Sequence, residues 1–286
     1  MTELRQGFLD LLRIRHHSPN TIARYEKIVE ELALFHMRSP VEMVAEDIQV
    51  FLYHCVNILK YSPATTNQYI AGLRTFYSLM APEKLKIMDN FRKLRVGKKI
   101  PHVLEREEVS ALIQAIPNIK HRAAIALMYS SGVRVSECVA LKIRDVESTR
   151  RMLRVEQGKG GRDRYTILSR HTIELLREYY RACHPYHWLF ESRRGTNNHI
   201  STATLTQVLK RAARHAGITK RVYPHILRHC FATHLLENGV QLNVIQSYLG
   251  HRHLKTTCTY AHVTQRMLEN VVSPEDMLAE AVPHAV

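Results

Sequence analysis

A short stretch near the end of the sequence holds residues that could bind a phosphate. "HILRHCFATHLLENG" begins at His225, directly after Pro224, and Arg228 follows three residues after His225. Residues three apart share one face of a helix, and proline suits the first helical position. The unpaired amides and the dipole of a first helical turn attract an anion, so an arginine and a histidine there could form a phosphate pocket. A histidine at this place is also common in helices that bind nothing.

Three other segments hold side chains that phosphate chemistry uses. They are Arg134 with Glu137 in "SGVRVSE", Lys159 in "GKGG", and His251 nine residues before Tyr260 in "LGHRHLKTTCTY". Each has a simpler explanation when taken alone: an ion pair that steadies a turn, a solvated lysine, a surface tyrosine. The lysine turn is not a nucleotide-binding loop, because neither Ser/Thr nor a helix follows it.

Taken together, these residues suit the attack of a phenol on a phosphodiester. Two arginines could bind the non-bridging oxygens and stabilise the charge of the transition state. At pH 7 only about one tyrosine in a thousand is ionised, a handicap of roughly 4 kcal/mol, so a base and cationic neighbours are needed. A mobile lysine could protonate the leaving sugar oxygen. The product would be a covalent phosphotyrosine link.

The sequence predicts no metal and no cofactor. His225, His229, Cys230 and His234 could suggest zinc, but no second cluster has the usual ligand spacing. The five cysteines contain no C-x-x-C pair, which favours a reducing compartment over a disulfide framework. The charged N-terminal stretch is not typical of a signal peptide, and no apolar run is long enough to span a membrane. We therefore expect a cytoplasmic protein without membrane contact.

The charge balance favours a polyanionic partner. The 286 residues include 41 Lys and Arg against 26 Asp and Glu, a formal net charge of +15. Such an excess is typical of nucleic-acid-binding proteins, although a generally basic soluble protein is the alternative.

The elements that must position these residues fall into two regions. Residues 1–90 predict a compact four-helix domain, because Ser-Pro pairs at residues 18, 39 and 62 suit helix starts and apolar stripes follow. Residues 91–101 predict a basic interdomain linker. Its candidate contacts with a DNA backbone are Arg92, Lys93, Arg95, Lys98 and Lys99. A solvated loop would have the same composition.

Residues 102–286 predict a second, mainly helical domain with one β-hairpin. "RMLRVEQ" and "RDRYTILS" alternate apolar and polar residues on either side of the glycine-rich turn. Helices are expected around 170–182, 201–216, 224–238 and 241–249. Gly217, Gly239 and Gly250 stand where C-terminal caps would lie.

The ordered motifs resemble those of the Xer and phage integrase family of tyrosine recombinases. The family pattern is G-x-R-x-S-E, a hairpin lysine, H-x-L-R-H, L-G-H and a tyrosine nine residues after the last histidine. Here it stands as "SGVRVSE", "GKGGR", "HILRH", "LGH" and "TTCTYAHV". The likeness covers residues 101–270 and extends more loosely to the first half. Cys230 and Cys258 depart from the residues often found there, at positions without a catalytic role.

The resemblance implies a role for each motif residue. Tyr260 would be the nucleophile that forms a 3′-phosphotyrosyl bond, with Arg134 and Arg228 on the scissile phosphate. Lys159 would be the general acid. His225 would assist proton transfer, His251 would hydrogen-bond the phosphate, and Glu137 would position Arg134.

The resemblance also implies the fold and the partners. The fold would be mainly α with a small sheet, two domains closing on double-stranded DNA as a C-shaped clamp. The protein would act as a dimer or tetramer on two DNA sites, and a C-terminal helix would dock in cis or in trans. Three questions stay open. They are the target sequence, the choice between dimer resolution, integration, excision and transposon resolution, and the need for a partner recombinase or accessory protein. Two other functions also stay open, a related tyrosine topoisomerase and an inactive DNA-binding accessory protein.

Overall fold

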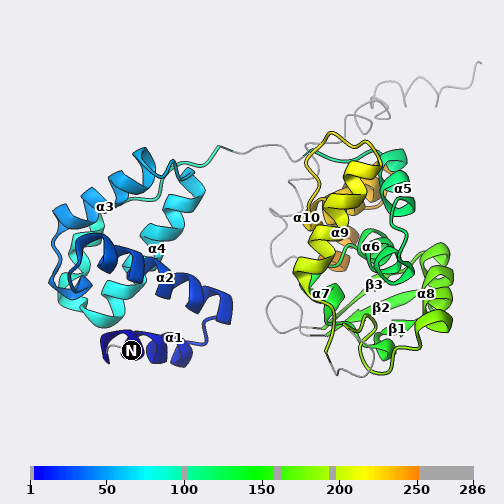
Figure 1. Cartoon of the computed structure of the whole chain (residues 1–286), viewed down its shortest axis with the longest axis horizontal. Helices are drawn as coiled ribbons and strands as arrows, with labels where there is room; N and C mark the ends of the chain where they lie inside the picture. The colour runs from blue at the N-terminus through cyan, green and yellow to red at the C-terminus, as the bar shows by residue number, and fades with distance from the viewer. Residues whose placement is uncertain (1–2, 98–101, 157–162, 193–197, 251–286) are drawn as a thin grey trace, which may run out of the picture. The chain divides into compact units, whose positions relative to one another are not determined.

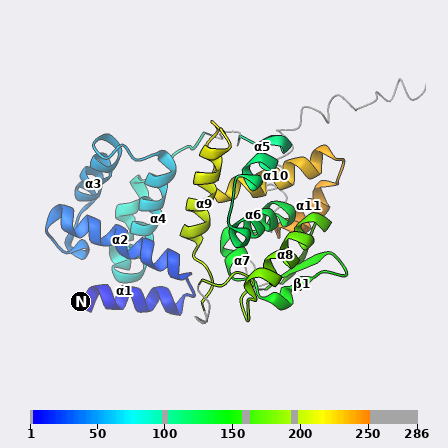
Figure 2. The ribbon, with the colours of Figure 1, turned by 45° about the vertical axis from the view of Figure 1, so that its right-hand side comes forward.

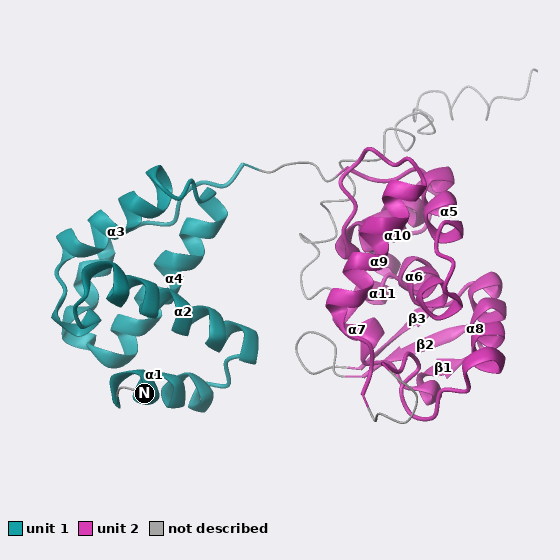
Figure 3. Ribbon diagram, in the orientation of Figure 1, with its two compact units in different colours: residues 1–98 teal, residues 99–286 magenta. Residues whose placement is uncertain are grey.

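The chain folds into two compact units with separate hydrophobic cores. The computed structural model describes residues 3–97, 102–156, 163–192 and 198–250. Contacts divide the chain into residues 1–98 and 99–286 (Figure 3). The core of the first unit includes Phe8, Leu32 and Phe76, and that of the second includes Leu127 and Phe190. None of the helices in the described ranges is long and apolar enough to cross a membrane.

The first unit has the four α-helices that the sequence predicts. They are α1 (Glu3–Ile14), α2 (Pro19–His36), α3 (Ala45–Asn57) and α4 (Pro63–Met80), with 3₁₀ segments η1 (Pro40–Glu42) and η2 (Pro82–Asn90) (Figure 1). Helix α1 packs against α2 and α4, and α3 packs against the same two helices. Tyr77 lies fully buried at the end of α4 and donates a hydrogen bond to the Pro40 carbonyl.

Two of the three Ser-Pro pairs start α-helices. The hydroxyls of Ser18 and Ser62 accept hydrogen bonds from the backbone N–H three residues on, at 3.3 and 3.2 Å. The third pair starts only η1, and Ser39 makes no side-chain cap. Helix α3 begins five residues later because the Asp47 carboxylate accepts the Val44 N–H at 2.9 Å. The expected helix start at Ser39 was therefore wrong.

The second unit surrounds one buried helix. Its helices are α5 (Arg106–Gln114), α6 (Ile119–Ser131), α7 (Val135–Val139), α8 (Arg170–Cys183), α9 (Thr202–His215), α10 (Pro224–Glu237) and α11 (Leu242–Leu249), with the 3₁₀ segment η3 (Ile143–Asp145). Residues 123–128 of α6 are buried on every side, as expected of a helix that is apolar all round. Helices α5, α8, α9 and α10 pack against it (Figure 2). The four helices predicted after residue 170 are confirmed.

A small antiparallel sheet completes this unit. Its strands are β1 (Val146–Glu147), β2 (Met152–Val155) and β3 (Arg164–Ile167), in the order β1-β2-β3. The predicted hairpin is confirmed, with Leu153 opposite Thr166 and Val155 opposite Arg164; β1 was not predicted. Strand β3 packs against α11 and α6, so its first residue, Arg164, lies near the end of α11. The fold class, mainly helical with a small sheet, agrees with the prediction.

Candidate active site

A tight turn between α6 and α7 presents Arg134. Gly132 ends α6 with a backbone φ of +64°, a left-handed conformation that favours glycine. Arg134 is the N-terminal cap residue of α7, and its N–H donates to Glu137 Oε2 at 2.8 Å. Its Nη1 donates to Oε1 of the same carboxylate at 2.7 Å. The glutamate three residues on therefore fixes both the backbone and the side chain of Arg134.

A second arginine, which the sequence analysis missed, binds the same carboxylate. Arg164 Nη1 lies 3.0 Å from Glu137 Oε1, and its Nη2 lies 2.7 Å from Oε2. Burial would raise the pKa of Glu137, but Arg164 and the Arg134 N–H lower it to about 2. Glu137 therefore stays ionised at every pH at which the protein would work.

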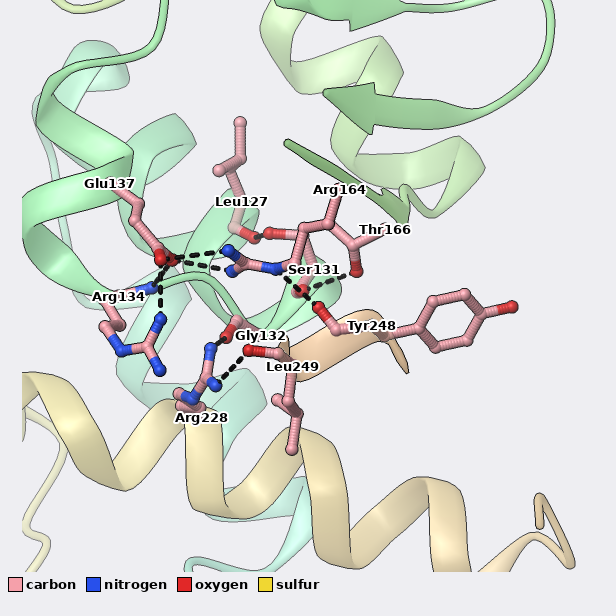
Figure 4. Close-up of polar contacts among 10 residues, drawn as sticks. All are labelled: Leu127, Ser131, Gly132, Arg134, Glu137, Arg164, Thr166, Arg228, Tyr248 and Leu249. Carbon is pink, nitrogen blue, oxygen red and sulfur yellow. Dashed lines mark hydrogen bonds and ion pairs between the residues drawn. The ribbon is translucent and has the colours of Figure 1, made fainter. Parts of the chain in front are cut away.

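Arg228 ties this turn to α10 and α11 (Figure 4). It is 3% exposed. Its Nη1 donates to the Gly132 carbonyl at 2.7 Å, and its Nη2 donates to the Leu249 carbonyl at 2.5 Å. The guanidinium thus links the end of α6 to the end of α11, directly before His251 in the sequence.

His225 lies in the first turn of α10, three residues before Arg228. No side-chain cap hydrogen bond is made by Tyr223 at the N-cap, and Pro224 supplies no N–H. The His225 residue remains accessible to solvent. Partial loss of hydration lowers its pKa, and the charges of Arg228 and Arg134 lower it further. A neutral imidazole that can accept a proton therefore lies beside two guanidinium groups.

Comparisons with known proteins show which family the chain belongs to. The phage integrase family matches residues 102–267, and the N-terminal SAM-like domain of phage integrases matches residues 4–87. A protein of Sinorhizobium fredii named integrase/recombinase is 34% identical over 99% of this chain and 92% of its own. The tyrosine recombinase XerA of Pyrococcus furiosus is 32% identical over 98% of this chain and 96% of its own. The chain belongs to the phage integrase family. It is a tyrosine-type site-specific recombinase.

A solved structure supports the fold of the recombinase independently. The XerH site-specific recombinase bound to palindromic difH substrate superposes with a TM-score of 0.68 at 24% identity, covering 87% of this chain and 76% of the XerH chain. At that identity the likeness concerns the fold alone.

The described part of the recombinase includes only some of the predicted site residues. Arg134 is hydrogen-bonded to Glu137, and Arg228 is hydrogen-bonded to the carbonyl of Gly132, which lies two residues before Arg134. His225 lies on the same helix as Arg228. Lys159, His251 and Tyr260 lie outside the described residues, as do Lys98 and Lys99 of the predicted linker. The catalytic roles of all these residues stay predictions.

The N-terminal unit carries a basic cavity of about 1000 Å³ beside the starts of α2 and α4. Its cationic lining residues are Arg24, Arg74, Arg92 and Lys93. Asn67 of α4 holds the chain here, since its amide donates to the Leu94 carbonyl at 3.0 Å and its Oδ1 accepts the Leu94 N–H at 2.7 Å. Two of the predicted DNA-contacting residues, Arg92 and Lys93, thus line this cavity of the N-terminal unit.

Two further histidines of α10 lie inside the catalytic unit. His234 Nδ1 lies 2.8 Å from the Tyr129 hydroxyl, and its side chain lines the contact between α10 and α6. His229 lies five residues before His234 on the same helix. Among the described residues, no three His, Cys, Asp or Glu side chains come together in a way that could hold a metal ion.

Acid should destabilise the recombinase through these two histidines. Burial lowers the pKa of His229 and of His234, so the unfolded state binds more protons than the folded state below about pH 6.5. Their contribution is present above that pH and is lost as the pH falls, by up to about 1.4 kcal/mol per pH unit for each histidine. We expect urea unfolding to show this decline between pH 7.5 and 5. His234→Gln should make it shallower, whereas the exposed His171→Gln should not; equal slopes in all three proteins would contradict it.

Proposed function

We propose that this recombinase cleaves and rejoins DNA strands through a covalent 3′-phosphotyrosyl intermediate formed by Tyr260. The observation that carries the proposal is the convergence of Arg134 and Arg228 on the turn at Gly132, with His225 beside them. Guanidinium groups match the geometry of phosphate oxygens and stabilise the charge that develops when a phosphodiester is attacked.

The two arginines contribute differently to the proposed phosphate site. Arg228 is fixed by two backbone carbonyls and is almost fully buried, so its position depends on α6, α10 and α11 together. Arg134 is 18% exposed and is held by one carboxylate, so its guanidinium is the more accessible of the two. Arg228, which is held in place, and Arg134, which is accessible, would bind the two non-bridging oxygens of the phosphate without a metal ion.

Different side chains would accept and donate the protons of the proposed reaction. His225, whose pKa is lowered, would accept the proton of the Tyr260 hydroxyl as the phenol attacks. Lys159 would protonate the 5′ oxygen that leaves, and His251 would hydrogen-bond the phosphate. Resealing would reverse these transfers, since the phosphotyrosine link keeps the energy of the broken bond.

The partner would be double-stranded DNA, bound by both units. The net charge of +15 supplies long-range attraction. In the N-terminal unit, the cavity lined by Arg24, Arg74, Arg92 and Lys93 would receive the phosphate backbone, with Arg95 and the lysines at 98 and 99 along the linker. Two protomers on each of two DNA sites would exchange strands. The XerH recombinase, which shares this fold, is bound to a palindromic difH substrate.

The test is the formation of a covalent protein–DNA adduct. Labelled duplexes from the regions that flank the gene, each nicked near a candidate site, are incubated with the protein in excess EDTA and separated in SDS. A nick lets the short fragment diffuse away, so the adduct accumulates. We expect an SDS-resistant adduct with the wild type and none with Tyr260→Phe.

Other outcomes would contradict parts of the proposal. An adduct that persists in Tyr260→Phe would exclude Tyr260 as the nucleophile, and an adduct that forms only with added Mg²⁺ would exclude metal independence. Tight binding to a defined site without any adduct would favour a DNA-binding accessory protein. On a supercoiled plasmid that carries the same site, relaxation without any product that joins two DNA molecules would favour a topoisomerase.

A further inference from the structure

We propose that Arg164 is a positioning residue of the phosphate site, which holds Glu137 so that the guanidinium of Arg134 stays open to a phosphate. The proposal rests on the function proposed above. Arg164 stands at the start of β3, 30 residues after Arg134 in the sequence. Its side chain is hydrogen-bonded to Glu137 and to the Tyr248 carbonyl near the end of α11.

The Glu137 carboxylate is saturated by its two arginine neighbours. Oε1 accepts from Arg134 Nη1 at 2.7 Å and from Arg164 Nη1 at 3.0 Å. Oε2 accepts from the Arg134 N–H at 2.8 Å and from Arg164 Nη2 at 2.7 Å. Arg164 and Glu137 form a two-hydrogen-bond pair that is largely buried, with 9% of the Glu137 side chain and 10% of the Arg164 side chain exposed. The carboxylate thus accepts two hydrogen bonds from the guanidinium of Arg164 and only one from the guanidinium of Arg134.

This division leaves Arg134 able to bind a second anion. Within the described part of the chain, Glu137 is the one acceptor of its guanidinium hydrogen bonds. A carboxylate and a guanidinium prefer to pair through two parallel hydrogen bonds. Without Arg164, the buried carboxylate would turn onto Arg134 and occupy the N–H groups that a phosphate needs. Arg164 therefore keeps the positive charge of Arg134 available.

Arg164 also fixes the end of α11. Its Nε donates to the Tyr248 carbonyl at 2.9 Å (Figure 4). Gly250, two residues later, has a φ of +64°, and a Cβ there would lie 2.8 Å from Arg164 Cδ. The arginine side chain thus fills the space that a glycine leaves, directly before His251. One residue at the base of the hairpin thereby connects the turn of Arg134 with the helix end that leads to His251 and Tyr260.

The first test compares Arg164→Met and Arg164→Lys with a matched variant. Arg154→Met removes an arginine from the neighbouring strand β2, where Arg154 forms ion pairs with Asp163 and Glu156. We expect Arg164→Met to slow adduct formation by about 100-fold, the scale of a small misplacement at a reacting centre. The dissociation constant for DNA should change little. Arg164→Lys should recover only part of the rate, because an ammonium lacks the fork, and Arg154→Met should react like the wild type.

A double variant separates positioning from folding. Glu137→Gln removes the charge that would capture Arg134, so Arg164→Met with Glu137→Gln should react about tenfold faster than Arg164→Met alone, a coupling typical of residues in contact. Thermal unfolding of each variant gives the folded fraction. Arg164→Met reacting at the wild-type rate, or a double variant no faster than the single one, would overturn the proposal.

A crystal structure of Arg164→Met tests the inference without any reaction. We expect Glu137 to pair with Arg134 through both oxygens and the Tyr248 carbonyl to lose its donor. An unchanged single contact between Glu137 and Arg134 would overturn the proposal. If the wild type forms no adduct, the proposed function fails, and this structural result still decides the role of Arg164.

Discussion

Replacing Arg228 by alanine should lower the rate of adduct formation by about 10³–10⁵-fold, the range in which an arginine stabilises a phosphoryl-transfer transition state. The guanidinium is 3% exposed and donates to the carbonyls of Gly132 and Leu249. Its removal would leave two buried acceptors unpaired, at about 1–3 kcal/mol each. Activity and stability should therefore fall together, and urea unfolding must accompany the rate measurement.

Arg228→Lys separates charge from geometry. Lysine keeps the positive charge, but one ammonium cannot reach both carbonyls with the fixed fork of a guanidinium and also face a phosphate. We expect a rate between those of the wild type and the alanine variant. Arg221→Ala, which removes an exposed arginine just before α10, should leave the rate of the nicked-DNA reaction and the stability near wild type. A similar rate loss in Arg221→Ala would mean that net charge, and not the place of Arg228, governs the reaction.

Much of the fold could be predicted from the sequence because its signals are local. The hydroxyls of Ser18 and Ser62 cap their helices as expected, and Gly217, Gly239 and Gly250 adopt the positive φ values of helix ends. The failure at Ser39 is also local in origin. A carboxylate eight residues on, that of Asp47, made a competing cap at Val44, and a pattern of Ser-Pro pairs contains no information on that competition.

The site was predictable only where a residue type itself carries the signal. Arg134 and Glu137 are close in sequence, and their pairing follows from the turn. Arg164 lies in a hairpin, and whether it faces the core depends on strand register, which a shift of one residue reverses. An arginine between Asp163 and Tyr165 in "RDRYT" offers no sign of which side of the strand is buried.

Contacts to backbone carbonyls were beyond sequence reasoning. The acceptors of Arg228 and Arg164 are the carbonyls of Gly132, Leu249 and Tyr248. A carbonyl is the same in every residue, so its use as an acceptor depends on how the helix ends are packed together. The positions of the two arginines are thus a property of the assembled unit, and the glycines that let the chain pass close to them are part of the site.

Gly132→Ala should therefore be among the most destabilising single-methyl changes in the described part of the protein. A Cβ at this position would lie 2.3 Å from Phe231 Cδ1, and the backbone φ is +64°. The left-handed conformation costs about 1–2 kcal/mol for a residue with a Cβ. Crowding of the buried ring adds about 1–3 kcal/mol. The Gly132 carbonyl would move with the backbone, so Arg228 would lose its anchor and adduct formation should fall as well.

Gly217→Ala isolates the conformational part of this cost. Gly217 has a φ of +67° and open space around the Cβ position, so its substitution should cost only the first of the two contributions. Urea unfolding of both variants gives the difference that belongs to Phe231. In a Phe231→Leu background, which removes the ring, that difference should shrink and part of the adduct formation should return. Equal losses of unfolding free energy in Gly132→Ala and Gly217→Ala would contradict this prediction. They would mean that the Phe231 ring moves aside at no energetic cost, so that its close packing on Gly132 does not hold Arg228 in place.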